Sequence, residues 1–91
     1  MRDRVASQSW DANCGLWQAV LNERPIPPLR LQNNRRTPVA VSARVMWARD
    51  GEQWADTFAV DWVGDSVLVE VHDRRRQTKG VWLPAADVVR R

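Results

Sequence analysis

The hydrophobic positions of this chain change their period near residue 38. From residue 39 every second residue is apolar, in the series Val39, Val41, Ala43, Val45 and Trp47. A period of two predicts a β-strand with one buried face. The Asp50-Gly51 pair that follows is typical of a hairpin turn, because glycine adopts a positive φ at little cost.

The residues after this turn predict a second strand with two different faces. One face carries Trp54, Asp56, Phe58, Val60 and Trp62, and the other carries Gln53, Ala55, Thr57, Ala59 and Asp61. Gly64-Asp65 marks a second turn, and valines alternate again over residues 67–71. A charged loop, a short strand at 81–83, a tight helical turn at 84–86 and a last short strand at 87–90 complete the pattern. Short strands with close turns predict a mainly β domain, and so few residues favour one small barrel over two sheets.

The first part of the chain has a different pattern. Residues 1–8 are polar and are expected to fray. Trp10, Cys14, Trp17 and Leu21 follow at helical spacing, so an amphipathic α-helix is predicted over residues 9–24. Ser9 or Asp11 is suited to cap its start, and Pro25 ends it. A lone helix of about twelve residues is marginal in water, so it must pack on its own barrel or on another chain.

Residues 25–38 form a proline- and arginine-rich arm between the predicted helix and the first strand. Three prolines in four positions, Pro25, Pro27 and Pro28, favour an extended polyproline II course. The rest of the arm is polar and is expected to be a loop that leads to the strand at residue 39.

The end of the chain resembles the SH3-like barrel superfamily, which includes Tudor-type domains. The resemblance rests on Gly80, the strand Val81-Trp82-Leu83, Pro84, one tight helical turn and a final strand. It covers residues 39–91 and implies a five-stranded antiparallel SH3-like barrel, without a specific family. The chain has no tyrosine, so the acidic, tyrosine-rich surface with which SH3 domains hold proline peptides has no counterpart here.

The reactive side chains predict a protein that is not an enzyme. The single cysteine excludes an intramolecular disulfide, and one cysteine with one histidine cannot form a zinc site within the chain. His72 stands beside Asp73, but neighbours on a strand point to opposite faces, which favours a surface histidine over a catalytic dyad. There is no glycine-rich phosphate loop. We therefore expect no catalytic residue, no metal and no cofactor.

Several features favour a cytoplasmic location. A free cysteine fits a reducing compartment. No run approaches the ~20 apolar residues of a membrane helix, so no membrane association is expected. The first residues lead into no apolar stretch, so no signal peptide is expected.

The charge distribution gives the leading functional hypothesis, which is weak nucleic-acid binding. The formal net charge is +3, and all of the excess positive charge lies in residues 1–38. Residues 49–70 are acidic and residues 73–80 are basic. Arginines contact phosphates and an exposed tryptophan stacks on bases. Trp82 is the best stacking candidate, because it points away from the face of Val81 and Leu83. The predicted contacts are Arg35, Arg36, Arg74, Arg75, Arg76, Lys79 and Trp82.

The alternative hypothesis is a protein-interaction or homodimerisation module. The arm fits the P-x-x-P-x-R spacing read by proline-binding grooves, and the predicted helix carries an apolar stripe. Oppositely charged patches on one molecule also favour self-association. The candidate residues are Trp10, Trp17, Leu21, Pro25, Pro28 and Arg30.

Overall fold

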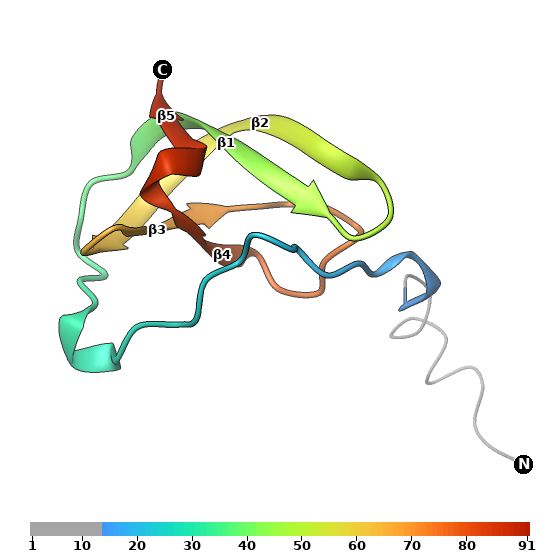
Figure 1. Ribbon diagram of the computed structural model, residues 1–91. Coiled ribbons are helices and arrows are strands. Elements are labelled where there is room, and N and C mark those ends of the chain that lie inside the picture. The colour runs from blue at the N-terminus through green and yellow to red at the C-terminus, as the bar shows by residue number, and fades with distance from the viewer. Residues whose placement is uncertain (1–13) are drawn as a thin grey trace, which may run out of the picture.

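The computed structural model describes residues 14–91 as one antiparallel sheet with an arm beneath it (Figure 1). The sheet has five strands in the order β4-β3-β2-β1-β5. The strands are β1 (Val39–Trp47), β2 (Gly51–Val63), β3 (Ser66–Glu70), β4 (Gly80–Pro84) and β5 (Val88–Arg90). The described residues also form three 3-10 turns, η1 (Cys14–Leu16), η2 (Leu29–Leu31) and η3 (Ala85–Asp87). The mainly β fold and its five strands are therefore confirmed.

The two predicted turns have the geometry that their glycines allow. Gly51 ends the β1–β2 turn with a φ of 79°, and Gly64 turns β2 into β3 with a φ of 59°. These are left-handed conformations that residues with a Cβ adopt only at a cost. β1 pairs with β2 over its full length, from Val39 opposite Ala59 to Trp47 opposite Gly51.

The sheet is not closed into a barrel, which corrects the expectation of a closed cylinder. β4 and β5 are its two edge strands, and η3 joins them without a pairing between them. The N-terminal segment (residues 14–24) contacts the end of β1 and the free edge of β4 instead. The Leu21 N–H donates to the Met46 carbonyl at 2.7 Å, and the Arg24 N–H donates to the Trp82 carbonyl at 2.7 Å.

The predicted helix over 9–24 is wrong in the part that the structure describes. Residues 14–91 contain no α-helix; the segment forms the single 3-10 turn η1, a β-bridge at Val20 and a turn at residues 21–22. Val20 makes a β-bridge with Trp47 and is only 5% exposed among the core residues. The backbone bonds of this segment to the end of β1 take the place of the hydrogen bonds within a helix, and so short a helix is marginally stable in water. Residues 9–13, with Trp10, lie outside the described residues.

No helix in residues 14–91 has the length and apolar character needed to cross a lipid bilayer.

The core confirms the alternation predicted for β1. Val41, Ala43, Val45 and Trp47 are each at most 2% exposed. They pack against buried residues of the N-terminal segment, β2, β4 and the β3 region, which are Val20, Ala59, Val69, Val71, Val81 and Leu83. The core thus lies between the β1–β2 layer and the β3–β4 layer (Figure 1).

A β-bulge in β2 changes which tryptophan faces the core. Ala59 lies opposite Val69, but Asp61 lies opposite Leu68, so one extra residue is inserted between them. Residues directly opposite in an antiparallel pair share a face. Trp62 lies opposite Val67, which packs against the core. Trp62 therefore turns inward, and the single-faced series predicted for β2 ends before it.

The arm (residues 25–38) passes below β4 (Figure 1), and Arg24, just before it, donates its N–H to the Trp82 carbonyl. Pro28 has polyproline II angles, φ −53° and ψ 140°, but η2 follows directly. The predicted extended course therefore holds only as far as Pro28. The salt bridge between Arg24 and Asp65, at 3.0 Å, holds the start of the arm near the β2–β3 turn.

Candidate functional site

Arg75, a predicted phosphate contact, is held by other side chains of the same chain. Its guanidinium lies 2.7 Å from the Asp73 carboxylate and 3.1 Å from that of Asp50. It also donates to the Gln53 amide oxygen at 2.7 Å and stacks 4.1 Å from the centroid of the Trp47 ring. The side chain is 22% exposed. Arg75 therefore joins the basic loop (residues 71–79) to the β1–β2 hairpin and is not free for a partner.

This arrangement shifts the pKa values of the groups around Arg75. The Arg75 hydrogen bond lowers the pKa of the Asp73 carboxyl from 3.8 to about 2, despite partial burial. The hydrogen bond from the Gln18 amide, followed by that from Arg75, lowers the pKa of Asp50. Both carboxyls are thus held in their charged form.

Arg76 is a second arginine of the basic loop whose guanidinium is bonded within the protein. It pairs with Glu23 at 3.2 Å and donates to the Gly80 carbonyl at 3.0 Å. Its side chain is only 11% exposed, and its Nε is buried without a partner among the described residues. Arg76 therefore holds the N-terminal segment against the loop.

Arg36 in the arm is engaged in the same way. It pairs with Asp61 at 2.9 Å and lies 4.2 Å above the Trp62 ring. Asp61 is 3% exposed and also accepts the backbone N–H groups of Asn33 and Trp62. Burial opposes the charge on Asp61, but these donors and Arg36 outweigh it and lower its pKa.

Trp82, the predicted stacking residue, is buried. Its neighbours Val81 and Leu83 belong to the core, so Trp82 faces the other side of β4, as the alternation predicted. It is nevertheless only 4% exposed, and the backbone of Arg24 is bonded to its carbonyl. The prediction that Trp82 stacks on a base is therefore wrong for this conformation. Of the predicted contacts, Arg35, Arg74 and Lys79 remain exposed.

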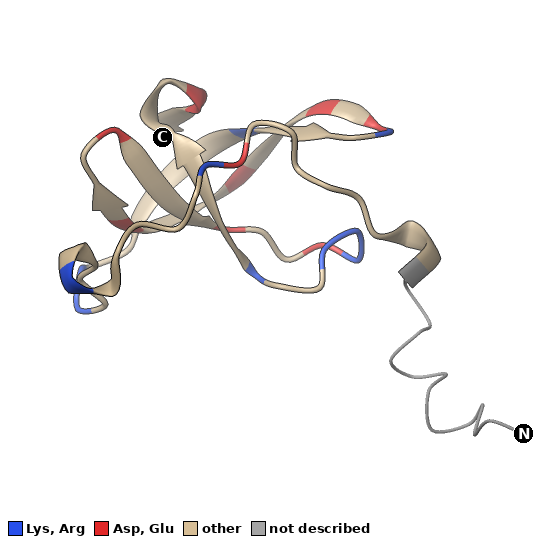
Figure 2. Cartoon of the chain, turned by 60° about the horizontal axis from the view of Figure 1, so that its bottom comes forward, with Lys and Arg blue, Asp and Glu red and all other residues tan. Residues whose placement is uncertain are grey.

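The charges that lie apart in the sequence neutralise each other in the fold. Acidic and basic positions adjoin at the β1–β2 turn and in the basic loop (Figure 2). Within residues 14–91, seven carboxylates pair with five arginines, which are Arg24, Arg36, Arg44, Arg75 and Arg76. In the same part of the chain, the cations without a carboxylate partner are Arg30, Arg35, Arg49, Arg74, Lys79, Arg90 and Arg91. The charge left for a partner is therefore positive.

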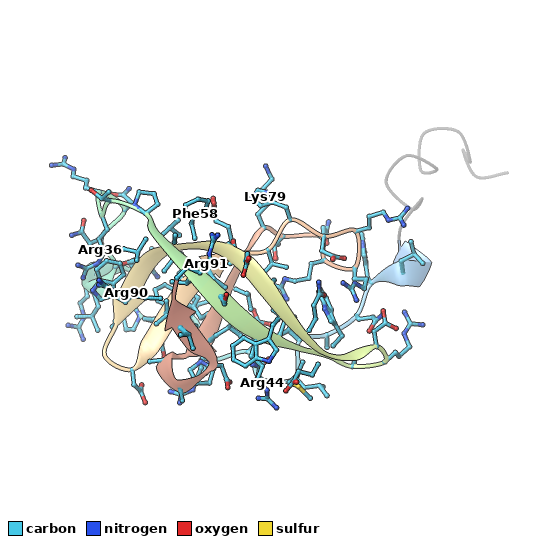
Figure 3. The ribbon with its side chains drawn as sticks, turned by 90° about the horizontal axis from the view of Figure 1, so that it is seen from above. Arg36, Arg44, Phe58, Lys79, Arg90 and Arg91 are labelled. Atoms are coloured by element: carbon cyan, nitrogen blue, oxygen red, sulfur yellow. The ribbon has the colours of Figure 1, made fainter. Side chains whose placement is uncertain are left out.

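The outer face of the sheet, the side of β1, β2 and β5 turned away from the core, exposes aromatic rings. Trp54 is 50% exposed and Phe58 is 46% exposed. The Arg91 guanidinium lies 5.6 Å from the centroid of the Phe58 ring and donates to the Val41 and Thr57 carbonyls. Figure 3, a view onto this face, shows Arg91 beside Phe58. A held cation and two exposed rings on one face form the candidate site.

Polar groups separate the two rings. Asp56 lies between them on β2 and accepts a hydrogen bond from the Ser42 hydroxyl at 2.6 Å. Arg44, which lies opposite Trp54, is paired with Glu52 at 2.6 Å and with Asp87 at 3.3 Å. The alternation in β2 placed both rings on one face, but which face is buried follows only from the pairing with β1.

His72 and Asp73 do not face each other as a dyad would. The Asp73 carboxylate is bonded to Arg75, and His72 Nε2 lies 3.9 Å from the Glu70 carboxylate. His72 is exposed, as expected for a surface histidine.

The residues predicted to bind a protein differ in their exposure to solvent. Leu21 is 64% exposed, Pro25, Pro28 and Arg30 are exposed, and Trp17 is half-buried. The sequence argument missed Ile26 and Leu29, which are 73% and 84% exposed. The turn η2 bends the chain within the P-x-x-P-x-R spacing, so the motif is not a continuous polyproline helix here.

The chain matches no protein-family model, and no curated protein or solved structure is significantly similar to it.

Proposed function

We propose that this protein is a non-catalytic module that binds single-stranded nucleic acid weakly on the outer face of its sheet. The observation that carries the proposal is the pair of half-exposed rings, Trp54 and Phe58, with Arg91 held over one of them. Stacking on an aromatic side chain contributes about 1–3 kcal/mol per base. Only unpaired bases present their faces to such a surface, which favours a single strand over a duplex.

The spacing of the rings suits two bases of one strand. Phe58 lies four positions after Trp54 on β2, which at a rise of about 3.3 Å per residue is roughly 13 Å. Asp56 lies between them, and its carboxylate repels a phosphate close to the sheet. We therefore propose that the sugar-phosphate backbone of the strand runs beside the row formed by Trp54, Asp56 and Phe58, towards the cations that have no carboxylate partner.

Four cations supply the electrostatic part of the proposed site. Arg91 lies over Phe58, and Lys79 of the basic loop is exposed. Arg35 and Arg74 are exposed and have no side-chain partner in residues 14–91. About four phosphate contacts to a single strand give a slope near −3 in log affinity against log salt concentration. This number of contacts supports weak, salt-sensitive binding.

The topology supports an architecture of the SH3-like kind. A meander of four strands is followed by a 3-10 turn after Pro84, and β5 returns to β1. We propose that the chain is an open form of this barrel, in which residues 18–24 lie where a closed barrel would join its edges.

Fluorescence anisotropy with a labelled twelve-residue oligo(U) and its double-stranded counterpart tests the proposed function. We expect Phe58→Ala and Trp54→Ala each to weaken binding by about fivefold or more. Leu29→Ala removes an apolar side chain from the arm that is more exposed than either ring, and it should leave binding unchanged. Asp56→Asn should strengthen it. Preference for the duplex, or aromatic variants that bind like Leu29→Ala, would overturn the proposal.

We propose protein binding through the arm as the second candidate function. Ile26 and Leu29 of the arm, and Leu21 just before it, present large aliphatic side chains that are 73%, 84% and 64% exposed. Large exposed apolar side chains are the groups from which interaction sites are built. Sedimentation of the whole protein measures self-association, and a pull-down with and without nuclease separates protein partners from nucleic acid. Loss of a nuclease-resistant partner in the double variant Ile26→Ser, Leu29→Ser would support this candidate, and an unchanged set would exclude it.

A further inference from the structure

An apolar cavity opens at the end of the core, where the sheet is not closed. Its volume is about 260 Å³, and its walls include Val39, Val41, Val67, Val88 and Trp62. β5 pairs with residues 41–43 of β1, and the Arg91 N–H donates to the Ala40 carbonyl at 3.1 Å, so the pairing on this side of β1 ends at Ala40. The short last strand thus leaves part of the core side of the sheet accessible to solvent.

Arg90 stands at this cavity as a cation without a carboxylate. It lies opposite Val41 in the β1–β5 pair, so it shares the inner face with the core valines. It is exposed, and no carboxylate pairs with it in residues 14–91. Among the described residues that line the cavity, none is acidic.

The arginine at the same end of the molecule has a different environment from Arg90. Arg36 lies at the same end of the molecule as Arg90 in Figure 3, but it is paired with Asp61 at 2.9 Å and stacked on Trp62. Its charge is therefore compensated, whereas the charge of Arg90 is not. An anionic ligand at the mouth of the cavity would compensate Arg90.

We propose that this cavity binds a small carboxylate with an apolar body, such as an aryl-alkanoate. A cavity of about 150 Å³ encloses a benzene molecule, so this larger one accommodates a ring with a short chain. The body of the ligand lies among the valines and against Trp62, and its carboxylate takes the two N–H donors of one side of the Arg90 guanidinium. This site is separate from the proposed nucleic-acid surface, because Arg90 lies on the inner face and Phe58 on the outer face.

Titration of the ¹⁵N-labelled protein with 3-phenylpropionate, followed by NMR, tests the proposal. We expect saturable shifts of the Val39, Val67 and Val88 amides and of the Trp62 indole N–H. 3-Phenylpropan-1-ol has the same apolar body without the charge and should bind at least about fivefold more weakly. Arg90→Gln should weaken binding of the acid by about the same factor and leave the alcohol unaffected.

Matched variants keep the test decisive. Arg74→Gln removes another exposed arginine and should not change the affinity for the acid. Val67→Phe fills the cavity and should abolish binding of both probes; the dispersion of its spectrum shows whether it folds. If Val67→Phe is unfolded, the comparison of Arg90→Gln with Arg74→Gln still decides. No saturable shift with the acid, equal binding of acid and alcohol, or equal effects of the two arginine variants would refute the proposal.

Discussion

Replacing Arg75 by alanine should destabilise the fold rather than merely remove a surface charge. The side chain connects the basic loop to the β1–β2 hairpin through Asp73, Asp50 and Gln53 and stacks on Trp47. Arg74, the preceding residue, is exposed and has no such contacts in residues 14–91. Arg74→Ala is therefore the matched control for the loss of one positive charge from the same loop.

The expected size of the effect follows from two routes that describe the same interactions. Charge-assisted hydrogen bonds contribute about 1.5–3 kcal/mol, and a cation–π contact adds about 0.5–1 kcal/mol at a partly exposed site, which gives about 2–3 kcal/mol after solvent screening. The pKa of Asp73, lowered from 3.8 to about 2, gives about 2 kcal/mol at neutral pH. We therefore expect a loss of about 2 kcal/mol, or roughly 8–16 °C in Tm for a domain of this size.

The pH dependence gives an independent check on the cause. Because the pKa of Asp73 is lower in the folded protein than in the unfolded chain, its contribution to the free energy of unfolding is present above the ordinary pKa of 3.8. That contribution is lost as the pH falls towards the folded value of about 2. The difference in stability between wild type and Arg75→Ala should therefore shrink as the pH is lowered from neutral to about 2.

Urea unfolding, followed by tryptophan fluorescence and circular dichroism, measures both quantities. Arg74→Ala should change the free energy of unfolding by no more than about 0.5 kcal/mol. Equal stabilities of Arg75→Ala and Arg74→Ala at neutral pH would show that the Arg75 contacts contribute nothing. A gap between wild type and Arg75→Ala that stays constant on acidification would show that Asp73 is not the partner responsible.

Three further predictions concern the fold around the site. Trp82→Phe should lower the free energy of unfolding by about 1–2 kcal/mol in urea but leave oligonucleotide affinity unchanged, because the side chain is buried. Arg36→Gln leaves the buried Asp61 carboxylate without its cation and should cost about 3 kcal/mol at neutral pH. This cost should shrink in urea titrations repeated near pH 3, since Asp61 stabilises the fold only while charged. Gly51→Ala should cost about 1 kcal/mol from its φ of 79° alone, since a Cβ there meets nothing within 4 Å, whereas Gly15→Ala should not destabilise the protein.

The strands were predictable because their signals are local. The alternation in residues 39–47 and the Asp50-Gly51 turn specify a hairpin without reference to the rest of the chain. The structure has β1 at Val39–Trp47, with its odd-numbered residues from Val41 onward buried.

The helix prediction was wrong because it used only the spacing of apolar residues and took no account of the strand on which this segment packs. Val20 is the residue that is buried against the core, and Leu21 of the predicted stripe is 64% exposed. The bonds that hold this segment go to Met46 and Ala48, more than twenty residues away. A weak local preference gives way to such tertiary contacts.

The bulge in β2 could not be predicted from the local sequence either. No glycine or proline marks residues 59–61. Asp61 is buried there because the arm supplies Arg36 and the Asn33 N–H as its partners. The change of face that brings Trp62 to the core therefore depends on contacts between distant parts of the chain.

The run of arginines at 74–76 shows why counting charges in a sequence overestimates a binding site. Its three members differ in the fold: Arg74 is exposed, whereas Arg75 and Arg76 are 22% and 11% exposed and hold carboxylates of the hairpin and the N-terminal segment. A charge already bonded to a carboxylate releases no counterion from a phosphate, so it adds nothing to the salt dependence of binding. The loss of binding in a triple alanine variant would thus arise from a loosened fold as well as from lost contacts. Single substitutions separate the two causes, because Arg74→Ala should flatten the salt slope by about 0.7 without lowering Tm. Arg75→Ala should lower Tm while the molecules still folded keep the slope of the wild type.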